Sequence, residues 1–370
     1  MIPYFLPAVA LLLQLRSKRA ICVLQCATSL LLCLFCAPSF AETHHFSLHA
    51  PNAKQVYLAG EMTDWETGKR PLSKDANGTW RLSVELGRGQ WLYKFIVDGE
   101  WIADPANPQY DSDGRGGQHS FVFSEAGPWQ EDASILHGRV ESFQVPSKAW
   151  GAPNKVHVYL PPGFLKKSQL PVLLLLHGRG LDADNFVKTG FIHRYMDNLI
   201  AQKKISQFVI VMPSSASVPY IEQSETFLTE ELPHWLAQQY GLQANRSRFA
   251  VAGISMGGFG AFHLPFAHAQ QFGMGYALSG YFPPEDIQQL KNRSALGFRF
   301  FMRCGSEDEL IQSNRDLVKA LREQNLPFSY REDAGGHSWQ YWSNRMEEML
   351  NITSQLFAES QDTSRQLKEE

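Results

Sequence analysis

The strongest constraint on the fold comes from seven short apolar segments in the C-terminal two thirds of the chain. They lie at 156–160, 172–177, 208–213, 249–254, 276–279, 299–304 and 328–331. Several are separated by stretches with helical spacing of apolar residues, such as Leu228, Leu232 and Leu236. A strand that is apolar throughout must be covered on both faces, and helices between strands provide that cover. We therefore expect an α/β fold, a mostly parallel sheet with helices on both faces, over 146–358.

Residues 44–123 follow a different pattern, with short strands and no helices between them. Residues 80–86 alternate apolar and polar side chains, which is typical of a half-buried strand. Strand signals at a spacing of about eight to twelve residues predict a small β-sandwich over 42–125. The Ser-, Glu-, Gly-, Pro- and Asp-containing stretch 126–145 is expected to be a linker that ends in a strand leading into the sheet. The polar residues 359–370 are expected to form a flexible tail.

The first 41 residues have the layout of a secretory signal peptide. Basic residues at 16–19 precede an apolar run at 20–36, and Ser39 and Ala41 occupy the small-residue positions of a cleavage site after Ala41. The alternative is a retained membrane anchor, but a run of about 17 residues is short for a span. We therefore expect export to the periplasm or beyond, and no stable membrane span after cleavage.

Charge and cysteine content exclude further classes. The chain has 34 basic and 37 acidic residues, a net charge of −3, and no basic run beyond 16–19, so no nucleic-acid partner is expected. Four of its five cysteines lie within the predicted signal peptide, which leaves Cys304 alone in the mature chain. We expect no internal disulfide, and an inert buried thiol because Cys304 lies in a strand-like apolar run.

Ser255, at the centre of Gly253-Ile-Ser-Met-Gly257, is the strongest catalytic candidate. It follows the apolar segment 249–252 and precedes a helix-like run. A strand, a sharp turn and a helix in this order form a nucleophile elbow, a turn too tight for β-carbons on either side of the serine. The turn points the hydroxyl outward at the start of the helix, where the dipole and free N–H groups stabilise developing negative charge. We therefore predict Ser255 as a nucleophile.

A second motif, 173–180, is an apolar strand that ends in His177-Gly-Arg-Gly180. A loop of this kind supplies one backbone N–H to the oxyanion hole of such folds. We expect the N–H of Arg179 to join the N–H of Met256 as the two donors that face a tetrahedral oxyanion. His177 itself is expected to be structural.

The general base should come late in the chain. His337 follows the run 328–331 in a glycine-containing loop, which leaves its imidazole free to reach Ser255. Its competitors are His177, His193, His263 and His268. The acid that orients the base is expected after 299–304, where Asp308 is preferred. Its rivals are Glu307, Glu309 and Asp333. The order Ser, Asp, His along the chain is that of α/β-hydrolases, so we predict a triad of Ser255, His337 and Asp308.

The predicted β-sandwich carries a recognisable motif set at 57–65, 91–101 and 104–105. It resembles the glycogen-binding type of immunoglobulin-like carbohydrate module, in which two Trp, one Lys and one Asn form a glucan platform. Trp65, Lys94 and Trp101 match three of these positions, and Gln118 stands at the Asn position. The resemblance implies a glucan ligand, because exposed indoles offer flat apolar faces to sugar rings. The alternative is that these tryptophans are core residues and the module only packs on its neighbour.

The C-terminal part carries six further motifs, at 158–164, 176–180, 230–233, 253–261, 304–308 and 336–339. Together they resemble the putative-esterase family, also called the esterase D or carbohydrate esterase family 1 group. Its members include feruloyl and acetyl-xylan esterases, enterochelin esterases, S-formylglutathione hydrolases and mycolyltransferases. The resemblance implies an α/β-hydrolase fold and places the triad on Ser255, Asp308 and His337. Arg179 is a departure, because glycine or an apolar residue is common at that position.

These observations predict an exported serine carboxylic-ester hydrolase without a metal or another cofactor. The sugar-module resemblance and export favour an acylated carbohydrate, such as a feruloyl or acetyl ester. A siderophore esterase of the enterochelin type is the alternative enzyme, and a glucan-binding protein with an inactive hydrolase domain is the alternative of another class. Hydrolysis and acyl transfer share an acyl-enzyme, so both stay open. The hydrolase part is too short to carry a large cap of its own, so we expect an open site. The N-terminal module is expected to form the roof over that site.

Overall fold

The computed structural model describes residues 41–369 except 114–115, 167, 217 and 290–298. The predicted signal peptide, 1–41, lies outside the described residues except for its last residue, Ala41. Within the described part, no helix is both long and apolar enough to cross a membrane.

The N-terminal module consists of two antiparallel sheets. One has the order β1 (Glu42–His49), β5 (Thr79–Leu86) and β4 (Ser73–Lys74). The other has the order β3 (Arg70–Pro71), β2 (Val56–Gly60), β6 (Gly89–Val97), β9 (Gln118–Ser124) and β8 (Tyr110–Ser112), and β7 (Glu100–Ile102) pairs with β6. The short 3₁₀ helix η2 (Glu61–Thr63) follows β2 directly. The expected small β-sandwich is confirmed.

Strand β6 contributes to the cores of both parts of the chain. Successive residues of a strand point to opposite faces of its sheet. Tyr93 and Phe95 point into the core of the module, where they pack with Phe46 of β1. Leu92, from the other face, belongs to the core of the C-terminal part. The outer face of β6 therefore lies against the C-terminal part of the chain.

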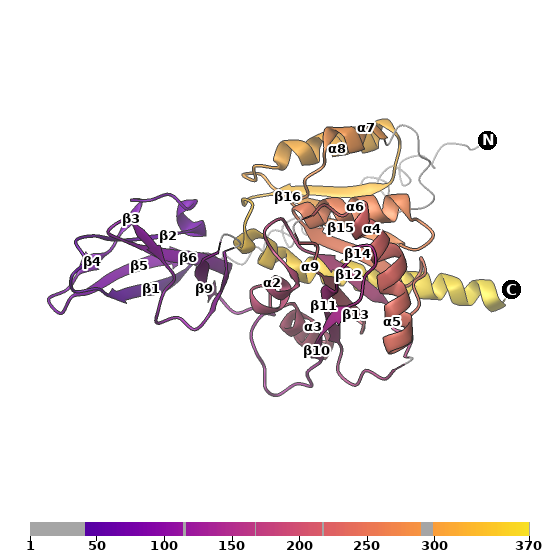
Figure 1. Cartoon of the computed structure of the whole chain (residues 1–370), viewed down its shortest axis with the longest axis horizontal. Coiled ribbons are helices and arrows are strands. Elements are labelled where there is room, and N and C mark those ends of the chain that lie inside the picture. Colours follow the sequence, from indigo (N-terminus) through magenta and orange to yellow (C-terminus); the bar gives the residue numbers. More distant parts are fainter. Residues whose placement is uncertain (1–40, 114–115, 167, 217, 290–298, 370) are drawn as a thin grey trace, which may run out of the picture. The chain divides into compact units, whose positions relative to one another are not determined.

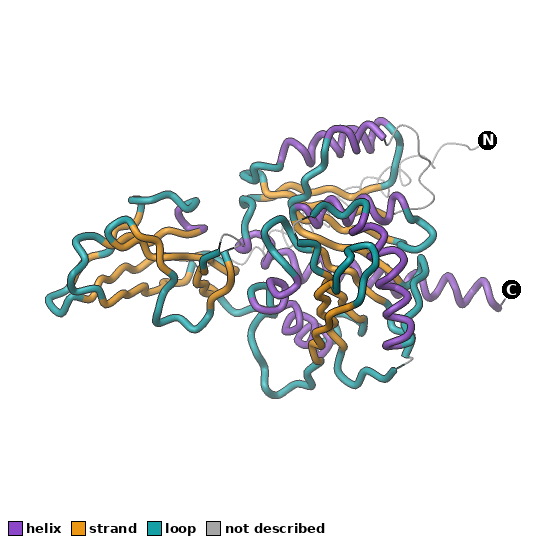
Figure 2. Tube along the Cα trace, in the orientation of Figure 1, coloured by secondary structure: helices purple, strands orange, loops and turns teal. Residues whose placement is uncertain are grey.

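The C-terminal part is built on an eight-stranded sheet (Figures 1 and 2). Its order is β10 (Arg139–Val145), β11 (Asn154–Leu160), β13 (Val209–Pro213), β12 (Val172–Leu176), β14 (Phe249–Ile254), β15 (Met274–Leu278), β16 (Arg299–Gly305) and β17 (Phe328–Asp333). The strands from β12 to β17 pair in parallel, and β11 is antiparallel to both β10 and β13. The seven apolar segments of the sequence are the seven strands from β11 to β17, which confirms the mostly parallel sheet.

Helices cover both faces of this sheet, as expected. One face packs on α2 (Ala183–Lys188), α3 (Ile192–Ala201) and α9 (Trp339–Glu369). The other packs on α6 (Met256–Ala267), on α8 (Ile311–Glu323) beside β16, and on the continuous helical run of α4 (Gln223–Thr226), the π-helical η3 (Phe227–Glu231) and α5 (Leu232–Tyr240). Helix α7 (Pro284–Gln289) contacts α8. Successive residues of a strand point to opposite faces of the sheet. In β12, Leu173 and Leu175 therefore pack on the face covered by α2, α3 and α9, and Leu174 packs on the other face.

The stretch 126–145 ends in a strand that leads into the sheet, as expected: its last seven residues, Arg139–Val145, are strand β10 at the edge of the large sheet. The loop before β10 differs from a simple linker at one point: most of its residues are exposed, but Trp129 is buried in the hydrophobic core of the C-terminal part. The polar composition of the segment hid this single large anchor.

The expected flexible tail, 359–370, is also corrected. Helix α9 continues to Glu369, and Glu359 forms an ion pair with Arg299 at the start of β16. Residues 359–369 contain no glycine or proline, so nothing in the sequence stops the helix. Buried residues further up the helix, such as Met346 and Met349, anchor it to the sheet. Cys304 is buried in β16, as expected, and burial raises the pKa of its thiol.

Candidate active site

Ser255 stands at a strained turn between β14 and α6. Its φ of 54° and ψ of −119° are unusual for a residue with a side chain. The two flanking glycines make this turn sterically feasible. A β-carbon at Gly253 would lie 2.2 Å from the carbonyl oxygen of Gly257, and one at Gly257 would lie 2.0 Å from the carbonyl oxygen of Leu176. Both contacts are with backbone atoms, so the glycines are needed for the reason that the sequence motif predicts.

Three polar side chains from three loops meet at this turn. His337 Nε2 lies 3.0 Å from Ser255 Oγ, and His337 Nδ1 lies 3.0 Å from one carboxylate oxygen of Asp308 and 3.1 Å from the other. An ionised carboxylate can only accept, so Nδ1 carries the proton and Nε2 is left to accept the Ser255 hydroxyl proton. The structure therefore brings together the three side chains predicted as a triad.

Each of the three follows a parallel strand of the sheet. Ser255 comes after β14, Asp308 after β16 and His337 after β17. The carboxyl ends of parallel strands lie at one edge of a sheet, which is where open α/β sheets place their sites. Topology alone therefore gathers these residues, although they are far apart in the sequence.

Burial and hydrogen bonding select Asp308 over its rivals. Asp308 is 2% exposed, and its Oδ1 accepts the backbone N–H of Leu310 at 2.8 Å. Burial acts to raise the pKa of Asp308, but the hydrogen bonds from His337 and Leu310 outweigh it and hold the pKa below its ordinary value. Glu307 and Glu309 are exposed. Asp333 instead accepts hydrogen bonds from Arg303, Arg345 and Tyr341.

The rival histidines have other partners. His177 is fully buried: its Nδ1 lies 2.8 Å from the carbonyl oxygen of Gly178, and its Nε2 accepts the N–H of Ser215 at 2.9 Å. Burial also lowers the pKa of His177, which matches the expected structural role. His263 and His268 both contact the same carboxylate, that of Glu225. His193 lines a separate cavity.

The two predicted oxyanion donors lie beside Ser255. Met256 follows it directly as the first residue of α6, where N–H groups have no partner within the helix. Arg179 follows Gly178, and a β-carbon at Gly178 would lie 3.2 Å from Cβ of Ser255. The loop that carries Arg179 therefore passes close to the serine, and both Gly178 and Arg179 line the same cavity as Ser255.

That cavity, of about 680 Å³, is shared by the two parts of the chain. Ser255 and His337 line it together with Trp65, Lys94 and Trp101 of the β-module. A serine at the edge of the hydrolase sheet and a face of the sandwich thus form one site. The expectation of a site roofed by the module agrees with this arrangement.

The tryptophans of the module are surface residues. Trp65 is 37% exposed and Trp101 is 42% exposed, so the alternative that they are core residues is contradicted. Their rings lie 6.5 Å apart with planes inclined by 32°. Lys94 Nζ donates to a carboxylate oxygen of Asp113 at 2.6 Å. Gln118 is exposed at the start of β9 and does not line this cavity, whereas the next residue, His119, does.

Three titratable residues of the cavity were not predicted from the sequence: Asp113, His119 and Glu61. His119 is buried, and burial lowers its pKa to about 4, so its imidazole is neutral at pH 7. Glu61 accepts backbone N–H groups from both parts of the chain. Burial raises the pKa of Glu61 to about 7 in spite of those hydrogen bonds, which lower it. No spacing or motif in the sequence signals that these residues face a serine in another domain.

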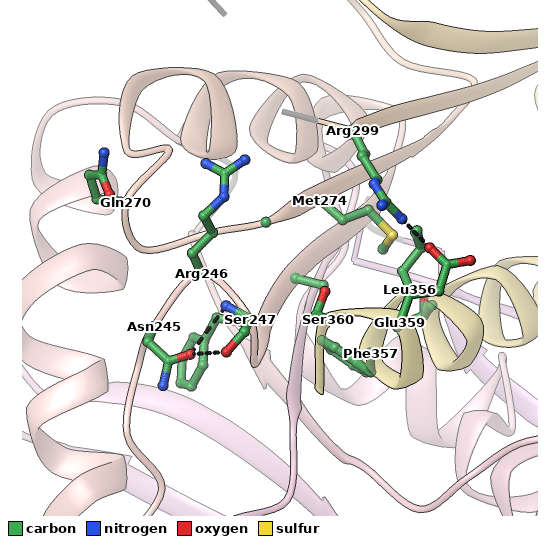
Figure 3. Close-up of a pocket in the computed structure, with 14 residues that line it drawn as sticks. Asn245, Arg246, Ser247, Gln270, Met274, Arg299, Leu356, Phe357, Glu359 and Ser360 are labelled. Atoms are coloured by element: carbon green, nitrogen blue, oxygen red, sulfur yellow. Dashed lines mark hydrogen bonds and ion pairs between the residues drawn. The ribbon is translucent and has the colours of Figure 1, made fainter. Parts of the chain in front are cut away.

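A second cavity, of about 570 Å³, lies at the amino-terminal ends of the parallel strands, opposite the ends that carry the predicted triad (Figure 3). Its lining includes the first residues of three parallel strands, Phe249, Met274 and Arg299. None of the residues predicted for the site lines it, and Arg299 is paired with Glu359. Among the described residues, no group of three His, Cys, Asp or Glu side chains could hold a metal ion.

The fold and the turn at Ser255 define the class of protein, an α/β-hydrolase. Within that class the chain belongs to the putative esterase family, whose model matches residues 147–352. A second family model, the glycogen recognition site of AMP-activated protein kinase, matches 46–126. Both resemblances expected from the sequence are thereby confirmed.

Individual proteins show similarity to both parts. An endo-1,4-beta-xylanase/feruloyl esterase of Xylanibacter ruminicola is 27% identical over 325 residues, which cover 82% of this chain and 44% of that protein. The chain therefore spans less than half the length of this relative. A solved ferulic acid esterase has 24% identity and a TM-score of 0.56, and covers 60% of this chain and 99% of its own. The enterochelin esterase of Shigella flexneri has 19% identity and a TM-score of 0.68, and covers 87% and 96%. These two likenesses show the fold.

Proposed function

We propose that this chain is a serine carboxylic-ester hydrolase that acts through Ser255, His337 and Asp308. The observation that carries the proposal is the continuous chain of contacts from Ser255 Oγ through both ring nitrogens of His337 to the buried carboxylate of Asp308. A glucan-binding protein with an inactive hydrolase domain has no need of this alignment, which favours the enzyme over that alternative.

The geometry supports the following sequence of steps. His337 Nε2 removes the proton from Ser255 Oγ, which attacks the ester carbonyl carbon. The N–H groups of Met256 and Arg179 hold the resulting oxyanion, and losing one such donor typically costs about 10²–10³ in rate. The imidazolium, stabilised by Asp308, then protonates the leaving alcohol and an acyl-enzyme forms. Water activated by His337 cleaves the acyl-enzyme in a second round of the same chemistry.

We propose an acylated carbohydrate as the substrate class. Trp65 and Trp101 offer two indole faces in the same cavity as Ser255, and such faces stack on sugar rings. The cavity volume is within the range of about 300–1,000 Å³ usual for small-molecule sites. The Xylanibacter ruminicola relative is an endo-1,4-beta-xylanase/feruloyl esterase, and its match covers 82% of this chain. Feruloyl and acetyl esters of polysaccharides are therefore the substrates to test first.

A siderophore ester is the second candidate. Enterochelin and enterobactin esterases of Shigella flexneri cover 85–88% of this chain, a share that extends over both parts of it. The indoles could equally pack against the aromatic rings of such a ligand. Export is a further proposal, supported by the charged, apolar and small-residue layout of residues 16–41.

An ester panel tests the function. The purified chain and its Ser255→Ala variant are given p-nitrophenyl acetate, methyl ferulate, acetylated xylan and enterobactin. We expect turnover by the parent and a loss of at least about 10³ in the variant, the scale seen when a triad nucleophile is removed. The preferred ester separates the carbohydrate candidate from the siderophore candidate. A folded parent without turnover on any of the four would refute the proposal.

A further inference from the structure

Glu61 of the β-module reaches into the catalytic part of the chain. It is the first residue of η2, directly after β2. One carboxylate oxygen accepts the N–H of Leu92, in β6 of the same module, at 3.0 Å. The other accepts the N–H of Trp339 at 2.7 Å. Trp339 is the first residue of α9 and lies two positions after His337.

The first turn of α9 determines where the imidazole of His337 stands. The His337 ring packs edge-on against Trp342, with ring centroids 5.0 Å apart. Trp342 is itself held, because its indole N–H donates to Ser279 Oγ at 3.1 Å. Ser338 Oγ accepts the N–H of Tyr341 and so caps the helix from within the loop. A shift of this turn would therefore move the imidazole relative to Ser255.

The carboxylate of Glu61 is suited to hold this turn. Above its pKa of about 7, Glu61 is ionised, and a negative charge at a helix N-terminus is stabilised by the helix dipole and by N–H groups that have no partner within the helix. Glu61 accepts one such N–H, that of Trp339 in α9, and its other oxygen accepts a strand N–H, that of Leu92 in β6. It also lines the cavity that contains Ser255 and His337. The bridge therefore connects docking of the module to the position of the catalytic loop.

We propose that Glu61 is a positioning residue: by holding the first turn of α9 it keeps His337 aligned with Ser255, so that activity depends on the docked β-module. The inference rests on the proposed function, because it takes His337 as the general base. The consequence is that the module serves catalysis even on esters that carry no sugar.

Glu61→Gln is the decisive variant, because it keeps the size of the side chain. The amide has one acceptor oxygen and one NH₂ donor group, so it cannot accept both N–H groups at once. At pH 8, above the pKa of Glu61, we expect kcat on p-nitrophenyl acetate to fall about tenfold to a hundredfold, the scale of a displaced catalytic group. The KM should stay within about twofold because acylation and deacylation both use His337. The downfield proton resonance of His337 Nδ1–H, read by NMR, should weaken or shift.

Two control variants separate positioning from general damage. Glu66→Gln makes the same substitution in the same module at an exposed residue, which pairs with Lys69, and should leave kcat unchanged. Gln90→Ala removes a different side-chain contact between the two parts, the 2.7 Å hydrogen bond to the carbonyl of Thr189, and keeps the backbone N–H that donates to Ser343 of α9. If Gln90→Ala lowers kcat and alters the His337 resonance as much as Glu61→Gln does, the effect is loosened docking and the proposal is overturned.

The test remains informative if Glu61→Gln folds poorly. Glu61→Asp keeps the charge and both acceptors on a shorter arm, and should lose less activity than Glu61→Gln. An unchanged kcat and an unchanged His337 resonance in a folded Glu61→Gln or Glu61→Asp protein would overturn the inference. Failure of the proposed function is recognised separately, since Ser255→Ala would then leave ester hydrolysis intact.

Discussion

Asp308→Asn tests the catalytic geometry most directly. In the protein, Oδ1 of Asp308 accepts the N–H of Leu310 at 2.8 Å, and Oδ2 lies 3.0 Å from His337 Nδ1. Leu310 would hold the oxygen of the new asparagine at the Oδ1 position. The amide nitrogen would then take the place of Oδ2 and donate to His337 Nδ1.

This arrangement forces the wrong tautomer on the imidazole. With Nδ1 as an acceptor, the proton of His337 moves to Nε2, which can no longer accept the hydroxyl proton of Ser255 at 3.0 Å. We expect kcat to fall by about 10⁴, the scale known for such a replacement in a Ser-His-Asp triad. This loss corresponds to about 5 kcal/mol of transition-state stabilisation.

The assay is steady-state hydrolysis of p-nitrophenyl acetate at neutral pH, with thermal unfolding to verify folding. Glu307→Gln is the matched control, because Glu307 is exposed in the same loop. Asp333→Asn tests the rival acid, whose carboxylate serves Arg303 and Arg345. A loss of less than tenfold for Asp308→Asn, in a folded protein, would refute the assignment of the triad.

Three further predictions follow from the site. Trp65→Ala and Trp101→Ala should each lower kcat/KM on a feruloylated saccharide about fivefold, which corresponds to a stacking contact of about 1 kcal/mol. The kcat/KM on p-nitrophenyl acetate should stay unchanged. Equal losses of kcat/KM on both esters would contradict a sugar subsite. Gly257→Ala should abolish hydrolysis and lower the Tm, because its β-carbon would lie 2.0 Å from the carbonyl oxygen of Leu176. The pKa of Glu61, about 7 in the folded chain against 4.5 when exposed, means that the folded state binds more protons between these pH values. The free energy of unfolding should therefore fall by at most about 3 kcal/mol as the pH rises through this window; a Glu61→Gln protein with the same slope in chemical unfolding would argue against it.

The sequence by itself determined the architecture of both parts and most of the predicted triad. Short apolar segments that alternate with helical patterns are typical of strands in a sheet between two layers of helices, and this pattern is readable without coordinates. The turn at Ser255 is a local feature, because Gly253 and Gly257 relieve clashes with backbone only a few residues away or on the adjacent strand. His337 was identifiable from its loop and its place after a strand, while Asp308 had two acidic neighbours as rivals.

Local composition was a poorer guide where a distant contact decides the structure. Residues 359–369 are polar, yet they are helical because α9 is anchored upstream and contains no helix breaker there. The loop before β10 was expected to be a linker, but Trp129 is buried in the core of the C-terminal part. Gln118 occupied the expected position in the motif, whereas the strand alternation of β9 places His119 in the cavity.

Only the tertiary structure showed that the tryptophan face of the β-module and Ser255 share one cavity. Glu61 and Trp339 are 278 positions apart in the chain, and their hydrogen bond exists only because β6 lies against the C-terminal part. A hydrogen bond of this kind produces no recognisable pattern in the sequence, because its donor and its acceptor belong to two elements whose own sequence patterns do not depend on each other. Strand and helix patterns depend on near neighbours and are therefore readable, whereas the packing of two finished domains depends on surfaces that only folding assembles.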